Sequence, residues 1–237
     1  MSHADFTKPD RTFGSSAALA VFILIVIYAI TTTLGFLSLK SPQDQIGDPY
    51  FTIMEVLIIL LVPPLIASMI AIHAYAAPGA KPYSLMALVF MVVMGTITSG
   101  LHFTVLTVSR QIEAVGLAGA PLFFSFKWPS VAYTLDILAW DWFFALSMLF
   151  AVPVFGEGRL EKTLRYFLIA SGVLSLIGLL GVPLAIMNVG YWFVVRNIGI
   201  VGYALIAPIA FLLLAMVFGR AEASQVDRKK GNYEAHT

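Results

Sequence analysis

The sequence predicts an all-α integral membrane protein, a bundle of six transmembrane helices with both termini in the cytoplasm. Two observations predict it: six apolar stretches are long enough to cross a bilayer, and Lys and Arg are unevenly divided between the intervening loops. Hydrophobic residues make up 59% of the 237-residue chain and charged residues 11%, with a mean hydropathy of +0.90. Soluble domains carry about 25% charged residues. This composition therefore excludes a water-soluble fold of this size.

The six apolar stretches each meet the requirement of about 20 helical residues for a bilayer core of about 30 Å. Gly, Pro and charged residues separate them, and none shows the polar–apolar alternation of a membrane barrel strand. The predicted spans are residues 15–39, 51–76, 83–108, 130–155, 164–187 and 191–219. We expect residues 1–14 to form a retained cytoplasmic tail and residues 220–237 a charged, disordered tail.

Lys and Arg fall mainly on one side of the predicted bundle. Ten of the 14 lie in the two tails and in the loops of the same side, three lie on the other side, and Arg196 lies inside the last span. The ten are Lys8, Arg11, Lys81, Arg159, Lys162, Arg165, Arg220, Arg228, Lys229 and Lys230, and the three are Lys40, Arg110 and Lys127. Because cytoplasmic loops carry the excess of Lys and Arg, we predict that both termini are cytoplasmic. The predicted location is the cell (inner or plasma) membrane.

Composition and motifs exclude several classes of function. The net charge of +1 argues against a nucleic-acid partner, which requires a basic surface. The absence of cysteine excludes disulfides, thiolate metal sites and cysteine nucleophiles. The sequence contains no HExxH motif, Gly-rich phosphate loop or nucleophile elbow. We therefore expect no cofactor. The expected partners are the lipid bilayer, a small amphipathic ligand, and either a second copy of the chain or subunits of a membrane complex.

Four ionisable residues from four spans are predicted to share one layer in the outer half of the bilayer. At about 1.5 Å per residue, Glu55 lies about 7 Å below the outer surface, and His102, Asp136 and Arg196 lie about 8 to 10 Å below it. Each such group costs about 2.5–3.5 kcal/mol at the centre of a span, so these groups are usually paired or line a water-filled cavity. We expect Arg196 to pair with Asp136 or Glu55, with His102 as a hydrogen-bond partner or proton shuttle.

Helical periodicity places aromatic side chains beside these charges. One face of the fourth span and one face of the sixth combine charged groups with the aromatic walls of a ligand pocket. These faces carry Tyr133, Asp136, Trp140, Phe143 and Ser147, and then Trp192, Arg196, Gly199 and Tyr203, with Asn197 one step round the helix. The candidate ligand-binding residues are Arg196, Asp136, Glu55, His102, Trp140, Tyr133, Trp192, Asn197 and Tyr203.

Asp141 is predicted to lie apart from this layer. It follows Asp136 by five residues, which places it about 140° round an α-helix and close to the middle of the bilayer. We expect it either to be protonated and hydrogen-bonded to a neighbouring helix or to belong to a proton or cation path. A metal site of His102, Glu55 and Asp136 is chemically conceivable, but one histidine beside an arginine argues against it, so no metal is predicted.

His73 is expected at the cytoplasmic end of the second span, as an interface histidine. It lies more than about 20 Å from His102 by helix rise, so the two cannot bracket one haem. At the outer end, the long loop 109–129 carries an aromatic run. We interpret that run either as an interface anchor or as a lid over a pocket. Pro63-Pro64 predict a kink in the second span, either a static bend or a hinge.

Three functions fit this pattern. The first is a membrane protein with a polar pocket in the outer half of the bilayer that binds or transports a small amphipathic molecule. If that molecule is anionic, Arg196 holds it. The second is an intramembrane enzyme on a lipid-like substrate, with His102 and a carboxylate, Asp136 or Glu55, as acid and base. The third is a structural or accessory subunit in which the polar layer clamps the helices. The sequence alone leaves these alternatives open, including whether the protein is an enzyme.

Overall fold

The computed structural model describes residues 6–41, 44–109, 111–112, 116, 118–180 and 190–234, and omits the side chains of 190–194 and 221–234. Every regular element in this part of the chain is a helix. Six helical stretches are long and apolar enough to span a membrane: Lys8–Leu37, Tyr50–Tyr75, Pro78–Ser109, Val131–Val154, Arg159–Leu179 and Val195–Arg220. The predicted all-α fold with six helices able to span a membrane is thereby confirmed, while the membrane embedding itself and the orientation across the bilayer stay predictions.

Three of the six spanning stretches, the third, fourth and sixth, are assembled from shorter helical elements. The elements are α1 (Lys8–Leu37), α2 (Tyr50–Tyr75), η1 (Pro78–Ala80), α3 (Lys81–Thr104), η2 (Val105–Ser109), α5 (Ala120–Phe124), α6 (Val131–Ile137), η3 (Leu138–Phe144), α7 (Ala145–Ala151), η4 (Val152–Val154), α8 (Arg159–Leu179), α9 (Gly190–Val201), η5 (Gly202–Ile206) and α10 (Ala207–Glu234). The third, fourth and sixth stretches each contain a π-helical segment, η2, η3 and η5 respectively.

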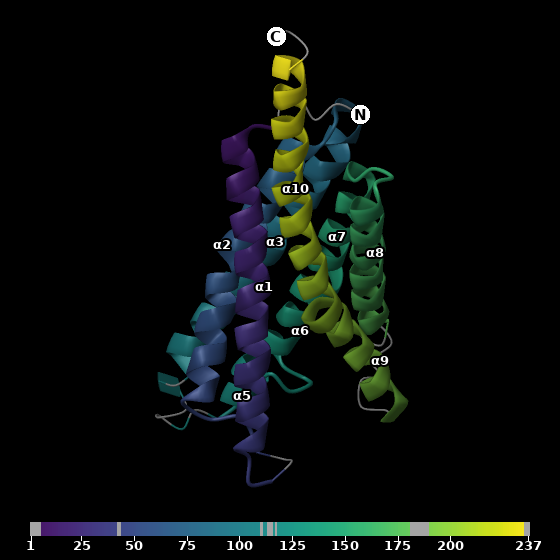
Figure 1. Cartoon of the computed structure of the whole chain (residues 1–237). Coiled ribbons are helices and arrows are strands. Elements are labelled where there is room, and N and C mark those ends of the chain that lie inside the picture. The colour runs from purple at the N-terminus through teal and green to yellow at the C-terminus, as the bar shows by residue number, and fades with distance from the viewer. Residues whose placement is uncertain are drawn as a thin grey trace.

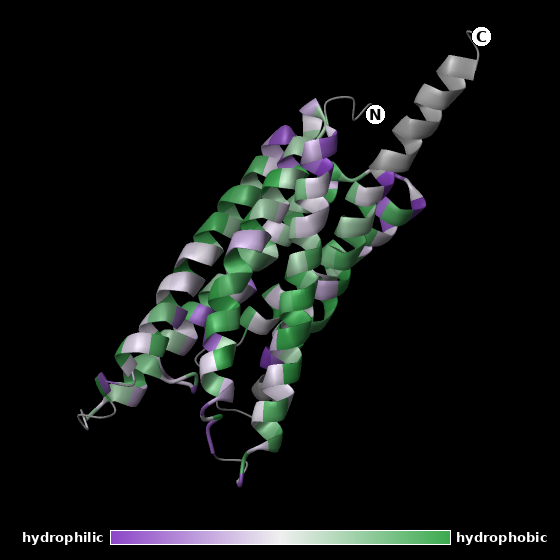
Figure 2. Cartoon of the chain, turned by 60° about the vertical axis from the view of Figure 1, so that its left-hand side comes forward, coloured by the Kyte–Doolittle hydropathy of each residue, from purple (hydrophilic) through white to green (hydrophobic). Residues whose placement is uncertain are grey.

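The bundle is held together by contacts between helices that are mostly neighbours in sequence. α1 packs against α2 and α10, α2 against α3, α3 against α7 and η3, and α8 against α7 and α9. The start of α1 and the end of α10 lie at the same end of the bundle, which we call the termini end, and α5 lies at the opposite end (Figure 1). Apolar residues cover the middle of the helices, whereas hydrophilic residues gather towards the two ends (Figure 2). This distribution matches a bundle whose middle faces lipid.

The first helix begins earlier than the predicted start of its span at residue 15. Thr7 is its N-cap, and a capping box joins the two ends of the first turn: the Asp10 side chain accepts from Thr7 N at 3.0 Å, and Asp10 N donates to Thr7 Oγ1 at 3.5 Å. Pro9 lies in the same turn, where its missing N–H costs nothing. The polar segment therefore extends the apolar helix instead of forming an irregular tail.

The last element of the chain and the second span are each one continuous helix. α10 continues as helical backbone to Glu234, past the predicted end of the sixth span at 219 and into the segment expected to be disordered. α2 runs as one helix through Pro63 and Pro64. Ser68 Oγ donates to the Pro64 carbonyl at 2.8 Å, one turn further on.

The three π-helical segments have a direct effect on the direction of side chains. A π-helical turn closes hydrogen bonds from i to i+5 instead of i to i+4, so it takes up more residues per turn than an α-helix. Residues beyond it are rotated relative to the 3.6-residue periodicity. η3 contains Trp140 and Asp141, and η5 contains Tyr203. Two of the three π-helical turns therefore contain residues that the sequence predicts to be functional.

Candidate functional site

Glu55, His102 and Asp136 meet inside the bundle, and we call these three residues the His102 cluster. They come from α2, α3 and α6. His102 Nδ1 lies 2.8 Å from Glu55 Oε2, and His102 Nε2 lies 3.6 Å from Asp136 Oδ1. Glu55 and His102 are only 4% and 5% exposed. The structure thus brings together three of the four residues that the sequence predicts to share one layer.

The two nitrogens of the His102 ring are held differently. The 2.8 Å contact with Glu55 is a normal hydrogen-bond distance, so this carboxylate fixes the orientation of the imidazole. The 3.6 Å contact with Asp136 is too long for a hydrogen bond, and Nε2 is buried without a hydrogen-bond partner among the described residues. One nitrogen is therefore anchored, while the other faces a carboxylate that is too distant for a direct hydrogen bond.

Phe126 covers the imidazole from the loop at the end opposite the termini. Its ring stacks on that of His102 with a centroid distance of 5.3 Å and an interplanar angle of 21°. The loop is braced by hydrogen bonds from Ser125 Oγ to the Pro121 carbonyl at 2.7 Å and from Ser130 Oγ to the Ser125 carbonyl. Ser130 also caps α6 through Tyr133 N. The loop that carries Phe126 is thus tied to the helix that carries Asp136.

A second polar group, which we call the Arg196 cluster, consists of Arg196, Asp141, Tyr133 and Tyr203. Arg196 Nη1 lies 2.8 Å from Asp141 Oδ2 and donates to Oδ1 at 3.1 Å. Arg196 Nη2 donates to the Tyr203 hydroxyl at 3.2 Å, and the guanidinium carbon lies 5.6 Å from the centre of the Tyr133 ring. The guanidinium is thus held by an ion pair, a phenol and an aromatic face.

The partner of Arg196 corrects the prediction made from the sequence. We expected Arg196 to pair with Asp136 or Glu55, and this expectation is wrong, because its described partners are Asp141 and Tyr203. Asp141 was expected to point about 140° away from Asp136 on a regular α-helix, and it lies outside the His102 cluster. The π-helical segment Leu138–Phe144 changes this angle, and Asp141 meets the arginine of the sixth stretch.

Two glycines allow Arg196 to reach Asp141. A Cβ atom built at Gly199 would lie 2.9 Å from Gly178 Cα and 3.1 Å from Asp141 Oδ1, and one built at Gly178 would lie 2.7 Å from Gly199 Cα. α8 and α9 therefore approach with their backbones almost in contact, as small residues permit in membrane bundles. This approach positions the helix that carries Arg196.

Aromatic residues surround the Arg196 cluster. The Trp140 ring lies 5.3 Å from that of Tyr203 and 5.4 Å from that of Phe144. Trp140 is buried, and Asn197 on α9 is half-buried. The side chain of Trp192 lies outside the described residues. Of the predicted aromatic candidates, Tyr133, Trp140 and Tyr203 thus gather around the charged pair.

Two residues near the His102 cluster were not among the predicted site residues. Phe126 lies in the aromatic run of the loop, but no sequence signal distinguishes it from the other phenylalanines there. Tyr28 of α1 lies near Asp136 and Glu55. Its pattern in the sequence is that of an ordinary apolar helix. Only the packing of α1 against α2 brings it to the site.

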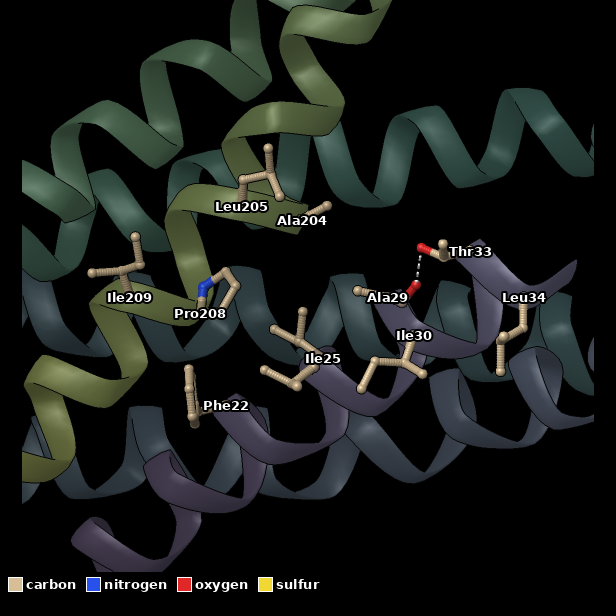
Figure 3. A pocket seen from close by; sticks show the side chains of 11 residues that line it. Phe22, Ile25, Ala29, Ile30, Thr33, Leu34, Ala204, Leu205, Pro208 and Ile209 are labelled. Atoms are coloured by element: carbon tan, nitrogen blue, oxygen red, sulfur yellow. Dashed lines mark hydrogen bonds between the residues drawn. The ribbon is translucent and has the colours of Figure 1, made fainter. Parts of the chain in front are cut away.

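An apolar groove of about 460 Å³ lies between α1 and the η5–α10 segment (Figure 3). Phe22, Ile25, Pro208 and Ile209 help to line it. The hydroxyl of Thr33 on its wall is satisfied by the Ala29 carbonyl at 2.8 Å. None of the predicted site residues lines this groove, so its chemistry matches the acyl region of a bilayer and not the predicted polar pocket.

Among the described residues, neither His73 nor any group of His, Asp and Glu side chains forms a second candidate site. His73 Nδ1 contacts Ser84 Oγ at 2.8 Å at the termini end of α2 and α3, far along α2 from Glu55. Within the described part of the chain, no group of three or more His, Asp or Glu side chains is arranged to hold a metal ion. The chemistry of the layer therefore belongs to the two clusters.

No protein-family model matches the chain, and neither the curated proteins nor the solved structures contain a significant match.

Proposed function

We propose that this multi-pass membrane protein binds or transports a small amphipathic molecule in exchange for a proton, with the His102 cluster as the proton-exchanging site. The proposal rests on the different contacts that the two imidazole nitrogens of His102 make. Nδ1 is fixed by Glu55, while Nε2 faces Asp136 at 3.6 Å without a hydrogen bond. Such a ring is oriented for proton transfer at one defined nitrogen.

The balance of charge in the two clusters favours a positively charged molecule. They contain three carboxylates, from Glu55, Asp136 and Asp141, against one arginine and one histidine. Asp141 neutralises Arg196. With both carboxylates ionised and the imidazole protonated, the His102 cluster would carry one negative charge in excess. Burying an uncompensated charge is costly, so this cluster is suited to take up a further proton or a cation.

This balance argues against the anionic ligand that the sequence suggests. An anion would need Arg196, but that guanidinium is already engaged by Asp141, Tyr203 and Tyr133. The Arg196 cluster is better explained as an interhelical clamp. This supports the third interpretation from the sequence, a structural role, for this half of the polar layer.

Proton release on binding tests the proposal directly. The purified protein would be mixed in weakly buffered detergent with a panel of amphipathic ammonium and phosphonium ions, such as tetraphenylphosphonium, and followed with a pH-sensitive dye. We expect up to one proton released per bound cation, and a large loss of this signal in Asp136→Asn and His102→Gln. Arg165→Met is the matched control, because its ion pair with Glu157 is at the surface. The absence of binding across the panel, or release unchanged in both variants, would refute the proposal.

An intramembrane enzyme is the second candidate, and the short Glu55–His102 contact favours it. A carboxylate that fixes the imidazole is also the arrangement of an oriented general base. This alternative predicts that incubation with a lipid extract yields new lipid species by mass spectrometry. The wild type should form them and His102→Gln should not.

A further inference from the structure

Four aromatic rings close the bundle at the termini end. They are Phe6, Tyr75, Phe155 and Phe218, all buried. The ring centroids of Phe6 lie 5.2 Å from Tyr75 and 5.3 Å from Phe218, and that of Tyr75 lies 6.0 Å from Phe155 and 5.6 Å from Phe218. The rings come from the segment before α1, the end of α2, the residue after η4, and α10. Tyr75 is the centre of the set, since it contacts the other three.

Glu161 ties the Tyr75 ring to the neighbouring helix. The Tyr75 hydroxyl donates to Glu161 Oε1 at 2.7 Å, and the backbone N–H of Gly156 donates to Glu161 Oε2. Glu161 lies in the first turn of α8. One carboxylate therefore joins α2, the turn after η4 and α8. A phenol–carboxylate hydrogen bond of this kind can break and re-form without loss of the ring packing.

Phe6 is inserted by a segment that folds back on the start of α1. The Arg11 guanidinium donates through Nε and Nη2 to the Phe6 carbonyl at 3.2 and 3.1 Å. Arg11 is itself buried. Close packing continues at Gly14, where a Cβ atom would lie 2.6 Å from the Ala71 Cβ and 2.8 Å from the Phe218 ring. The Phe6 ring is therefore held in a fixed, buried position at the termini end of the bundle.

The termini end and the His102 cluster lie far apart on the same helix. Glu55 and Tyr75 are separated by most of α2, about 30 Å at the α-helical rise. The His102 cluster is covered at its own end by the Phe126 ring of a loop. The two ends of the bundle thus have different aromatic covers.

We propose that Phe6, Tyr75, Phe155 and Phe218 form a gate, with Glu161 as its latch, that closes the termini end while the His102 cluster exchanges its ligand. This inference rests on the proposed function, because only a transport cycle requires the gate to open. In the predicted orientation the gate faces the cytoplasm. The described structure is then the state in which this side is shut.

The absence of cysteine makes the gate testable by single-cysteine labelling. Ala151→Cys places one thiol on α7, a turn deeper than Phe155 and at a position with no exposed surface. In proteoliposomes, a membrane-impermeant maleimide should react slowly with this thiol. Adding Tyr75→Phe, which removes the latch hydrogen bond and keeps the ring, should raise the rate about tenfold. Tyr166→Phe on exposed α8 surface is the matched control and should leave the rate unchanged.

Each result decides for or against the gate. Equal rates with and without Tyr75→Phe, an equal rise in the Tyr166→Phe control, or rapid labelling without any further substitution would show ordinary core packing and overturn the inference. Phe6→Ala, compared with Phe13→Ala on the exposed side of α1, gives a second reading if Tyr75→Phe does not fold. Tetraphenylphosphonium should also change the labelling rate. If the latch variant responds and the cation has no effect, the gate stands and the proposed function fails.

Discussion

Arg196 and Asp141 form a buried ion pair, with the arginine Nη1 2.8 Å from Asp141 Oδ2 and side-chain exposures of 5% and 0%. The two residues are 55 positions apart in sequence and belong to the sixth and fourth spanning stretches. The pair therefore fixes two helices against each other at one point. The pair also engages Arg196, the arginine that the sequence predicts to hold a ligand.

Removal of one partner of this pair should destabilise the protein strongly. Arg196→Met leaves the Asp141 carboxylate buried without its cation, a change that costs about 3–5 kcal/mol. Arg165→Met, which breaks the exposed pair with Glu157, should cost no more than about 1 kcal/mol. Thermal unfolding in detergent measures the difference. The double variant Arg196→Met, Asp141→Leu should recover much of the loss, and a single variant as stable as the Arg165 control would contradict the clamp.

Gly199→Ala should have nearly the same effect as breaking the pair. The added methyl group would meet backbone atoms of Gly178 and the Asp141 carboxylate, so α9 must move away from α8. Gly100→Ala in α3 is the matched control, because a Cβ there meets nothing within 4 Å, and it should be neutral or stabilising. Thermal unfolding of both variants checks this. A smaller loss for Gly199→Ala than for Gly100→Ala would show that the close approach is unimportant.

Phe126→Ala should expose His102 to reagents from its own end of the bundle. The stacked ring covers an imidazole that is only 5% exposed. Carbethoxylation by diethyl pyrocarbonate, followed by mass spectrometry of the His102 peptide, should become several-fold faster. Phe123→Ala removes an exposed ring from the same loop and is the control, while His73 in the same molecule is the internal reference. Equal rates in the two variants would mean that Phe126 is no lid.

Thr7→Ala should loosen only the first turn of α1. It removes the acceptor of Asp10 N and one half of the capping box, a loss of about 1 kcal/mol. Backbone hydrogen exchange of residues 8–12 should rise about fivefold, while the middle of α1 stays protected. Thr12→Ala in the same helix lacks a capping role, since its hydroxyl only donates to the Lys8 carbonyl. A similar rise in both variants would contradict the capping argument.

The sequence predicts the class of fold and half of the polar layer for a simple reason. Hydropathy and helical rise place residues by depth, and depth is enough to bring Glu55, His102 and Asp136 together. The partner of Arg196 depends instead on rotation about the helix axis. A π-helical turn changes that rotation, and the residue types between Leu138 and Phe144 do not predict such a turn. The packing of Phe126 and Tyr28 depends on contacts between distant segments, which periodicity along one helix does not contain.

The π-helical turn at Leu138–Phe144 also indicates how the polar layer can arise or be lost through a change of one residue. A π-helical segment is an α-helix with one residue too many, so deleting a single residue there would restore regular winding. The part of the helix before it would then rotate by about 100° relative to the part after it. Asp136 would turn away from His102 while Ser147, beyond the turn, kept its hydrogen bond to the Ala87 carbonyl. One codon inserted or lost, with every charged residue unchanged, is enough to assemble or dismantle this layer in a lineage.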